Sequence, residues 1–334
     1  MDSELLAMEK FRNLSLLFIF SAYGCEGNQS ALNATGSSAK IISDMFWWML
    51  IGAALIWIIF ISLGFYAIKH KSEADESRRK SLFVIGGGVV FPTVILSFLL
   101  YFSLTPLPKL LEPAPSGSLR LEVSGAQWWW RVRYPLENGN FVELANEIRL
   151  PVGEPVEIKL TSEDVIHSFW VPSLAGKMDM IPGNVTKLSF TPEKVGLFKG
   201  ACAEYCGASH ALMQLDVVVM KKEAFQEWLD WQKRPALEAK TAMAVKGKVS
   251  FKQNGCVACH TVRGVESRGV IGPDLTHVGS RLRLGAGVMI NSIPSYHQWI
   301  SRVEEIKPGV KMPSFNMISN EDIKAISVWL EGLK

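Results

Sequence analysis

The sequence predicts a multidomain chain in which a hairpin of two membrane-spanning helices precedes a β-sandwich and a small all-α domain. Three observations predict it: two long uncharged apolar runs, a stretch of short alternating strands, and two cysteine pairs that stand far apart. Hydrophobic residues make up 48% of the 334 residues, which is high for a purely soluble protein. The net charge is only +3, and no nucleic-acid partner is expected.

The N-terminus has the layout of a secretory signal. A short basic region is followed by the apolar run Leu14–Phe20 and then by Ser-Ala-Tyr-Gly-Cys25. A cysteine directly after a small residue is typical of a bacterial lipoprotein cleavage site, so residues 1–24 are predicted to be a leader and Cys25 to be lipidated. The alternative is a buried free thiol in an uncleaved segment. Residues 25–44 then form an exported N-terminal segment, and its small, polar part, residues 26–40, is predicted to be flexible.

Residues 45–104 are predicted to form a transmembrane helical hairpin. Met45–Tyr66 and Leu82–Leu104 are 22 and 23 residues long without a charge, and each exceeds the roughly 20 residues that cross a bilayer as a helix. Five Lys and Arg residues lie in the short loop between them, so the positive-inside rule places this loop in the cytoplasm. Both flanks, with the domains they carry, are therefore expected on the outer, periplasmic side of a bacterial cell membrane.

A proline-rich linker, residues 105–118, leads into the predicted β-sandwich, residues 119–220. Short β-prone segments separated by turn residues predict this fold. The segments are Leu119–Val123, Val156–Leu160, Leu188–Phe190 and Leu215–Met220. Residues 221–240 are predicted to form a charged connecting helix, whose large apolar residues recur at helical spacing and are expected to pack. Those residues are Phe225, Trp228, Leu229 and Trp231.

A metal-binding pattern stands just before the last of these strands. Two thiols, an imidazole and a thioether follow one another as Cys-x3-Cys-x3-His-x2-Met, and His167 lies 35 residues upstream. Soft sulfur ligands combined with imidazoles favour copper, and two cysteines on one loop can bridge a pair of copper ions. The candidate ligands are His167, Cys202, Glu204 through its backbone carbonyl, Cys206, His210 and Met213. A zinc site of two cysteines and two histidines would leave Met213 unused, and a Cys202–Cys206 disulfide would leave both histidines unexplained.

The second cysteine pair predicts a covalently bound haem. Cys256-Val-Ala-Cys259-His260 is a Cys-x-x-Cys-His attachment motif, in which the thiols bond to the haem and the histidine reaches the iron. Downstream, Pro308-Gly-Val-Lys-Met312-Pro313 supplies the expected second axial ligand, Met312. Its rivals are Met289 and Met317. A redox-active cysteine pair is the alternative, but it has no need of the histidine. Residues 241–334 are therefore predicted to be a small haem-binding domain.

The copper loop, its upstream His167 and the two-span hairpin resemble the CuA-containing subunit II of cytochrome c oxidase. The resemblance extends to about Met220, and the C-terminal part resembles a fused cytochrome c domain, the caa-type arrangement of haem–copper oxidases. It implies a cupredoxin fold for the β-sandwich, a dinuclear CuA centre and one haem c. It also implies a role as the electron-entry subunit, which passes electrons from an external donor through the haem to CuA and on to a catalytic subunit I that reduces oxygen.

The resemblance implies partners and further residue roles. The partners are subunit I and other oxidase subunits, the membrane, and cytochrome c or an upstream respiratory complex as donor. Trp128, directly after Gln127, corresponds to an exposed tryptophan at the electron entry; in this chain that surface alternatively faces the C-terminal domain, and a plain core aromatic is the third reading. Glu204 would help to bind a magnesium ion at the subunit I interface, near Asp179. Ile85 stands where relatives often carry an acid for proton entry.

A second function remains open from the sequence. A membrane-tethered CuA and haem electron-transfer protein could serve a nitric-oxide or nitrous-oxide reductase instead. For either function, the net charges of the two soluble domains affect how they dock and which donor they attract. Residues 119–239 carry 13 basic and 16 acidic residues, and residues 240–334 carry 13 basic and 7 acidic residues, giving −3 and +6. Opposite charge would favour docking of the two domains, and a positive haem domain predicts an acidic donor whose reaction slows as salt rises.

Overall fold

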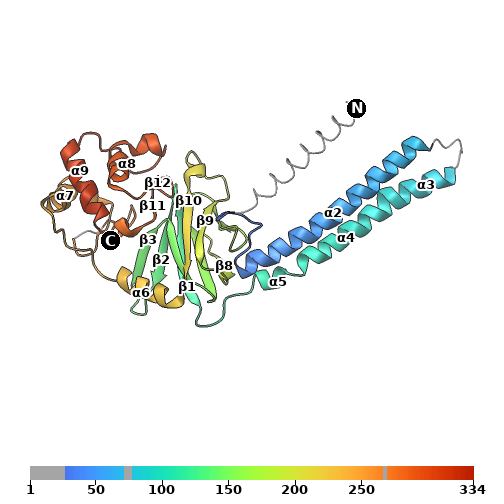
Figure 1. Ribbon diagram of the computed structural model, residues 1–334, viewed down its shortest axis with the longest axis horizontal. Helices are drawn as coiled ribbons and strands as arrows, with labels where there is room; N and C mark the ends of the chain where they lie inside the picture. Colours follow the sequence, from blue (N-terminus) through green and yellow to red (C-terminus); the bar gives the residue numbers. More distant parts are fainter. Residues whose placement is uncertain (1–26, 71–76, 266–268) are drawn as a thin grey trace, which may run out of the picture. The chain divides into compact units, whose positions relative to one another are not determined.

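The computed structural model describes residues 27–70, 77–265 and 269–334, and the chain divides into two units. One unit is the helical hairpin, Lys40–Glu112. The other contains the two C-terminal domains, Pro113–Lys334, together with the N-terminal residues up to Ala39 (Figure 1). The predicted leader and Cys25 lie outside the described residues.

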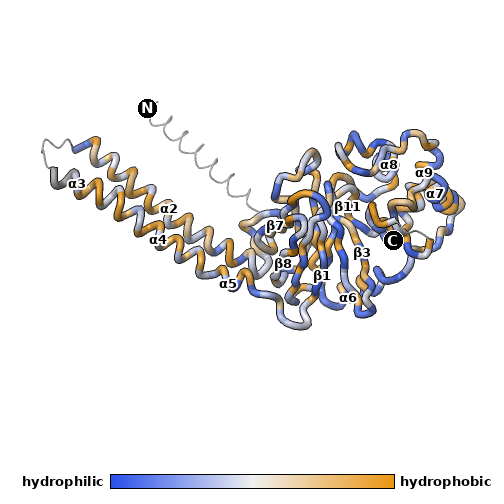
Figure 2. The backbone as a smooth tube through the Cα atoms, turned by 180° about the vertical axis from the view of Figure 1, so that it is seen from behind, coloured by the Kyte–Doolittle hydropathy of each residue, from blue (hydrophilic) through white to orange (hydrophobic). Residues whose placement is uncertain are grey.

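The helical unit confirms two long apolar helices where the spans are predicted. Helix α2 (Ser37–Lys69) is followed by α3 (Ser77–Ile85), a π-helical turn (Gly86–Val90), α4 (Phe91–Leu104) and α5 (Leu107–Leu110). Two helical stretches, Ser37–Lys69 and Ser81–Leu110, are long and apolar enough to cross a membrane. Figure 2 shows the apolar colouring along both of them. The large apolar side chains are exposed within this unit, which is the arrangement expected where lipid is the solvent.

The segment before α2 is ordered, so the prediction of a flexible leader up to residue 40 is wrong for its described part. The backbone N–H of Thr35 donates to Ser173 O (2.7 Å), and Glu193 N–H donates to Thr35 O (2.8 Å). Gly36 forms a β-bridge with Pro192, where a Cβ would overlap the backbone of Leu174. A polar composition did not predict this, because the segment is held by backbone hydrogen bonds to distant loops.

The β-domain is a sandwich of two five-stranded sheets, as predicted. The first has the order β3-β2-β1-β5-β8 and the second β4-β10-β9-β6-β7. Their strands are β1 (Leu119–Ala126), β2 (Trp129–Pro135), β3 (Phe141–Ala145), β4 (Glu147–Pro151), β5 (Val156–Ser162), β6 (His167–Trp170), β7 (Met178–Met180), β8 (Thr186–Phe190), β9 (Gly196–Cys202) and β10 (Gln214–Met220). Alternate residues point inward along the strands and build one apolar core.

Helix α6 (Lys222–Gln232) follows β10 and packs its apolar face on the sandwich. The ring of Tyr134 lies 5.5 Å from that of Trp228 and 6.3 Å from that of Phe225, between centroids. Both helix rings are buried. The expected packing role is therefore observed for Phe225 and Trp228.

The C-terminal domain is built mainly from three helices. These are α7 (Ala242–Gln253), α8 (Ile293–Ile306) and α9 (Asn320–Glu331), with 3-10 turns at Cys256–Ala258 and Val278–Ser280. Helices α7 and α9 pack closely, with the rings of Phe251 and Trp329 4.9 Å apart in an edge-to-face contact. The predicted all-α domain also contains a short hairpin of β11 (Arg283–Leu284) and β12 (Met289–Ile290).

Candidate metal and haem sites

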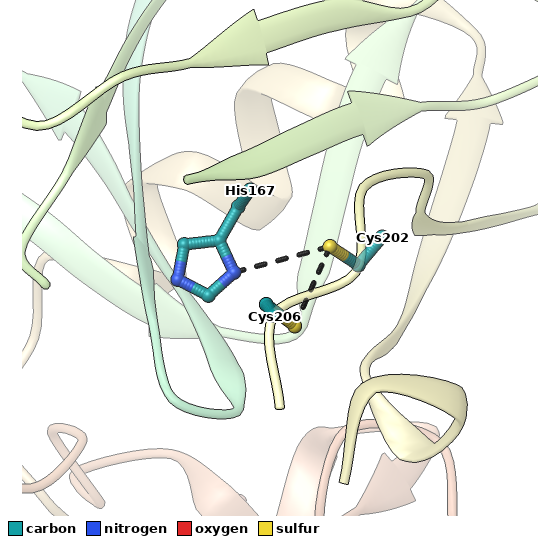
Figure 3. A group of neighbouring side chains, drawn as sticks. All are labelled: His167, Cys202 and Cys206. Carbon is teal, nitrogen blue, oxygen red and sulfur yellow. Dashed lines mark hydrogen bonds between the residues drawn. The ribbon is translucent and has the colours of Figure 1, made fainter. Parts of the chain in front are cut away.

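The topology of the second sheet brings the predicted copper ligands together. Cys202 is the last residue of β9, and Met213 directly precedes β10, so the intervening loop joins two paired strands. His167 opens β6, which pairs with β9 through Phe169 opposite Cys202. This pairing brings His167 close to Cys202, although the two residues are 35 positions apart in sequence. Figure 3 shows the ring of His167 turned toward the sulfur of Cys202, with that of Cys206 beside it.

The ligand atoms converge around the two thiols. Cys202 Sγ lies 3.8 Å from Cys206 Sγ, 3.9 Å from His167 Nδ1 and 3.1 Å from Glu204 O. Cys206 Sγ lies 3.5 Å from His210 Nδ1 and 4.0 Å from Met213 Sδ. Each sulfur therefore has one histidine and one weaker donor beside it. Both cysteines are free thiols.

This donor set fits copper. Met213 is fully buried and directs its thioether into the site, where a zinc site would have no use for it. The one-to-one grouping of His167 with Cys202 and of His210 with Cys206 suits two ions bridged by the thiolates. Soft ligands in this pattern favour copper over the harder divalent ions.

Asp164 completes the site, although the sequence reasoning missed it. Its Oδ1 lies 2.8 Å from His167 Nε2, and its Oδ2 accepts from the backbone N–H of Gln127 (2.8 Å). Because a carboxylate can only accept, Nε2 carries a proton, and Nδ1, which faces Cys202, is the ring nitrogen left for a metal. The available signal was the Asp-x-x-His spacing, in which a carboxylate stands three residues before a candidate ligand.

Burial and hydrogen bonding shift the pKa values of the two thiols in opposite directions. Burial opposes ionisation of Cys202, but hydrogen bonds from His167 and the backbone at Ser168 outweigh it and lower the pKa of that thiol. Burial, together with the charge of Cys202, raises the pKa of Cys206. Burial also opposes the charge of His167, but its bonds to Cys202 and Asp164 leave its pKa raised. Without metal, Cys202 is therefore the first thiol to ionise, and metal binding must remove the second proton.

Glu204, which is predicted to help bind magnesium, and Asp179, which is predicted to lie at the same interface, converge on a lysine. Lys177 Nζ lies 3.1 Å from Asp179 Oδ1 and 3.8 Å from Glu204 Oε2, and all three side chains are about half exposed. The hydroxyl of Ser168 also donates to Asp179 Oδ1 (2.7 Å). The hydrogen bond from Ser168, followed by that from Lys177, holds the pKa of Asp179 below its usual value. The geometry thus brings these oxygens close to one cation position.

The predicted haem ligands line a single cavity. Cys256, Cys259, His260 and Met312 share the wall of a cavity of about 440 Å³ between the C-terminal domain and the sandwich, whose lining also includes Trp128. Of the rival methionines, Met317 is 75% exposed and Met289 packs beside the domain's core. Neither is among the lining residues, so the structure favours Met312.

The cavity suits a haem with carboxylate groups. His260 Nδ1 lies 2.8 Å from Pro273 O, which can only accept, so Nε2 is left to face a metal. Burial lowers the pKa of His260 and keeps this ring neutral. On the wall, the buried hydroxyl of Tyr296 lies close to Arg281 and to the Asn291 side chain. A hydroxyl beside an arginine is a suitable partner for a haem carboxylate.

Trp128 is not exposed, contrary to the first expectation for it. It is only 6% exposed, and its indole Nε1 donates to Cys206 O (2.9 Å). A Cβ on Gly309 would lie 2.7 Å from its ring, because the haem domain covers it. The alternative expectation, a surface that faces the chain's own C-terminal domain, describes its position.

A cupredoxin-type sandwich with a soft-ligand loop and a haem-attachment domain defines a membrane-anchored electron-transfer protein. The family model for cytochrome c oxidase subunit II, periplasmic domain, matches residues 135–221, and that for cytochrome c matches residues 244–334. The chain is 31% identical to cytochrome c oxidase subunit 2 of Alkalihalophilus pseudofirmus over 97% of both chains. It is 32% identical to that of Bacillus subtilis over 74% of this chain and 70% of the relative.

A solved structure is also similar in part. The periplasmic domain of subunit II of cytochrome oxidase from Bradyrhizobium japonicum is 31% identical, covering 37% of this chain and 97% of that one, with a TM-score of 0.34. The full-length likeness to relatives is decisive: this chain belongs to the cytochrome c oxidase subunit 2 family and carries a C-terminal cytochrome c domain. It is a copper- and haem-binding subunit of an oxidoreductase complex, with oxidase subunits as its partners.

Proposed function

We propose that this chain is the electron-entry subunit of its oxidase. It would hold a dinuclear CuA centre and one haem c through the residues described above. The observation that carries the proposal is the position of Trp128. Its ring lines the haem cavity, and its indole N–H is bonded to the carbonyl of Cys206 in the copper loop. When bound, the haem and the copper pair supply the one-electron steps by which electrons pass from an external donor to the catalytic subunit.

The protein side chains contribute position and solvent exclusion. Asp164 holds the His167 ring with its Nδ1 toward the thiols. The carbonyl of Pro273 binds Nδ1 of His260 and thereby holds that ring with its Nε2 free for the haem iron. Gly272 allows the His260 ring to lie against the backbone, because a Cβ there would be 2.5 Å from Cε1. Both rings are thereby held in one tautomer and one orientation, which favours rapid transfer with little rearrangement.

The donor is proposed to be an acidic protein, cytochrome c or a respiratory complex, that meets the haem domain and not Trp128. The buried position of Trp128 supports this, since an external protein has no access to the ring. Residues 240–334, which contain the haem domain, carry the +6 charge expected to attract such a donor. Reduction of the full chain by an external donor should therefore slow as salt rises; rates independent of ionic strength would oppose the proposal.

On the side of the copper site that faces the catalytic subunit, Glu204 is proposed to share a magnesium ion with subunit I, with Asp179 at the same interface. Their convergence on Lys177 supports this, because a divalent cation could replace the ammonium there. The proposed location is the bacterial inner membrane, with both soluble domains outside and Cys25 as a lipid anchor. The basic loop between the spans supports this orientation.

Spectroscopy on the full chain in detergent tests the proposal. We expect paramagnetic resonance with hyperfine splitting from two equivalent coppers, beside the optical bands of a low-spin c-type haem. Met312→Leu should abolish the methionine-ligated haem spectrum, whereas Met289→Leu should preserve it. A mononuclear copper signal, or zinc in place of copper, would remove the CuA assignment.

A further inference from the structure

The two soluble domains are joined largely by hydrogen bonds between buried or half-buried groups, beside an ion pair of Arg283 with Asp216 (3.6 Å). The hydroxyl of Ser209, in the copper loop, donates to Pro308 O (2.7 Å). Two backbone amides cross the same boundary: Gln214 N–H donates to Ala286 O (3.1 Å), and Leu282 N–H donates to Glu147 Oε2 (2.8 Å). These bonds lie between segments of one compact unit.

Lys307 stands at the centre of this boundary and is only 2% exposed. Its Nζ donates to Trp128 O (2.7 Å), Leu212 O (2.8 Å) and Gly285 O (2.9 Å). A lysine ammonium has three N–H donors, and each has a carbonyl here. Burying a charge is costly unless it is hydrogen-bonded, so this arrangement stabilises the lysine only while the two domains remain together. Burial lowers the pKa of Lys307, whereas its three carbonyl acceptors, which can only accept, favour the charged form.

The three acceptors connect the lysine to both candidate sites. Leu212 directly precedes Met213 of the copper loop, and the indole of Trp128 is bonded to Cys206 O. On the other side, Lys307 is five residues before Met312, and the intervening Gly309 lies against the Trp128 ring. One ammonium group thus joins the segments that carry the ligands of the two sites.

We propose that Lys307 is a positioning residue that locks the haem domain onto the copper domain, so that the two sites keep a fixed separation. Its role in electron transfer rests on the proposed function. The lock uses uncharged carbonyl acceptors in a buried place, so salt does not release it. The haem domain is therefore held in its docked position and does not search for it on a flexible tether.

Hydrogen exchange on the full chain in detergent tests the lock, with Lys307→Met as the variant. The amides of Gln214 and Leu282 report on separation of the domains, and those of Val217 and Ile158, inside β10 and β5, report on unfolding of the sandwich. We expect the two boundary amides to exchange about 10- to 100-fold faster in the variant, because a hydrogen-bonded charge is lost. The two strand amides should keep their wild-type rates.

Lys324→Met is the matched control. Lys324 is an exposed lysine on α9, so this change removes the same charge from the same domain and should alter none of the four rates. Where Lys307→Met does not fold, Lys307→Gln retains two N–H donors and should give a smaller acceleration at the boundary amides. Unchanged boundary amides, or equal acceleration of all four amides, would overturn the proposal.

A second readout separates the lock from the proposed function. In the wild type, electron transfer between the two sites should be independent of salt and of solvent viscosity; in Lys307→Met it should become slower and dependent on both. Salt- or viscosity-dependent transfer in the wild type would overturn the lock. Absence of the copper-pair or haem spectra from the wild type would instead reject the proposed function, while the exchange result would still decide the lock.

Discussion

Replacing Asp164 by Asn should weaken copper binding, although Asp164 touches no metal. The carboxylate accepts at both oxygens, from His167 Nε2 and from the Gln127 amide, and Oδ1 also accepts from the Val165 amide. Asn has the same shape but only one acceptor oxygen. Either His167 or Gln127 must then face an N–H group, and the ring loses the charge that fixes its tautomer.

The magnitude follows from the burial of His167. Its side chain is fully buried, so no water can replace the lost acceptor. Removing such an outer partner typically weakens metal binding by about 10- to 100-fold. This corresponds to about 1.4 to 2.7 kcal/mol of binding free energy.

The assay is a copper titration of the full chain in detergent against a competing chelator, for the wild type, Asp164→Asn and Glu122→Gln. Glu122 pairs with Lys159 on the surface of the same domain, so Glu122→Gln removes an equal charge away from the site and should bind copper like the wild type. Equal copper affinity in Asp164→Asn and the wild type would show that the carboxylate does not hold the ligand. The resonance spectrum should also change, because the histidine loses its fixed orientation.

Three further predictions follow from the two sites. Gly272→Ala should leave haem attachment intact but remove the low-spin optical bands, because its Cβ would displace the His260 ring. Burial lowers the pKa of His277, so the folded state binds fewer protons than the unfolded one. Its contribution to stability should be present above about pH 6.5 and be lost as the pH falls further; melting temperatures of His277→Gln should fall less between pH 7 and 5. Copper at about 100 times its Kd should raise the free energy of unfolding in denaturant by about 2.7 kcal/mol.

Local sequence patterns predicted the parts of the molecule that local chemistry determines. The spans are defined by length and lack of charge. The copper loop is a short connection between paired strands, so its spacing alone brings Cys202, Cys206, His210 and Met213 near one another. The Cys-x-x-Cys-His motif likewise places two attachment cysteines and one axial histidine within five consecutive residues. His167 was added to the loop as the imidazole 35 residues upstream, but its approach to the thiols depends on the pairing of β6 with β9, which no local pattern encodes.

The features that escaped prediction depend on contacts between distant segments. The segment around Gly36 is polar in composition, yet it is ordered by backbone bonds to Ser173 and Thr191, which no local pattern encodes. Trp128 looked like an exposed entry residue because the segment that covers it, around Gly309, is 181 positions away. From the sequence, Lys307 is indistinguishable from the other basic residues of the positive domain. Its three acceptors come from three separate segments, so no local pattern marks it.

The net charges of the two soluble domains concern the arrival of an external donor, whereas the boundary between these domains concerns electron transfer from one site to the other. Charges of −3 and +6 would favour docking of the two domains, but the boundary is made largely of carbonyl acceptors and buried groups, which salt screens weakly. Long-range attraction is useful where partners must meet by diffusion, and two domains held together within one chain have no such search. The excess positive charge of the haem domain is then left to act on the external donor. Salt should therefore slow reduction of the chain from outside and leave transfer between its two sites unchanged.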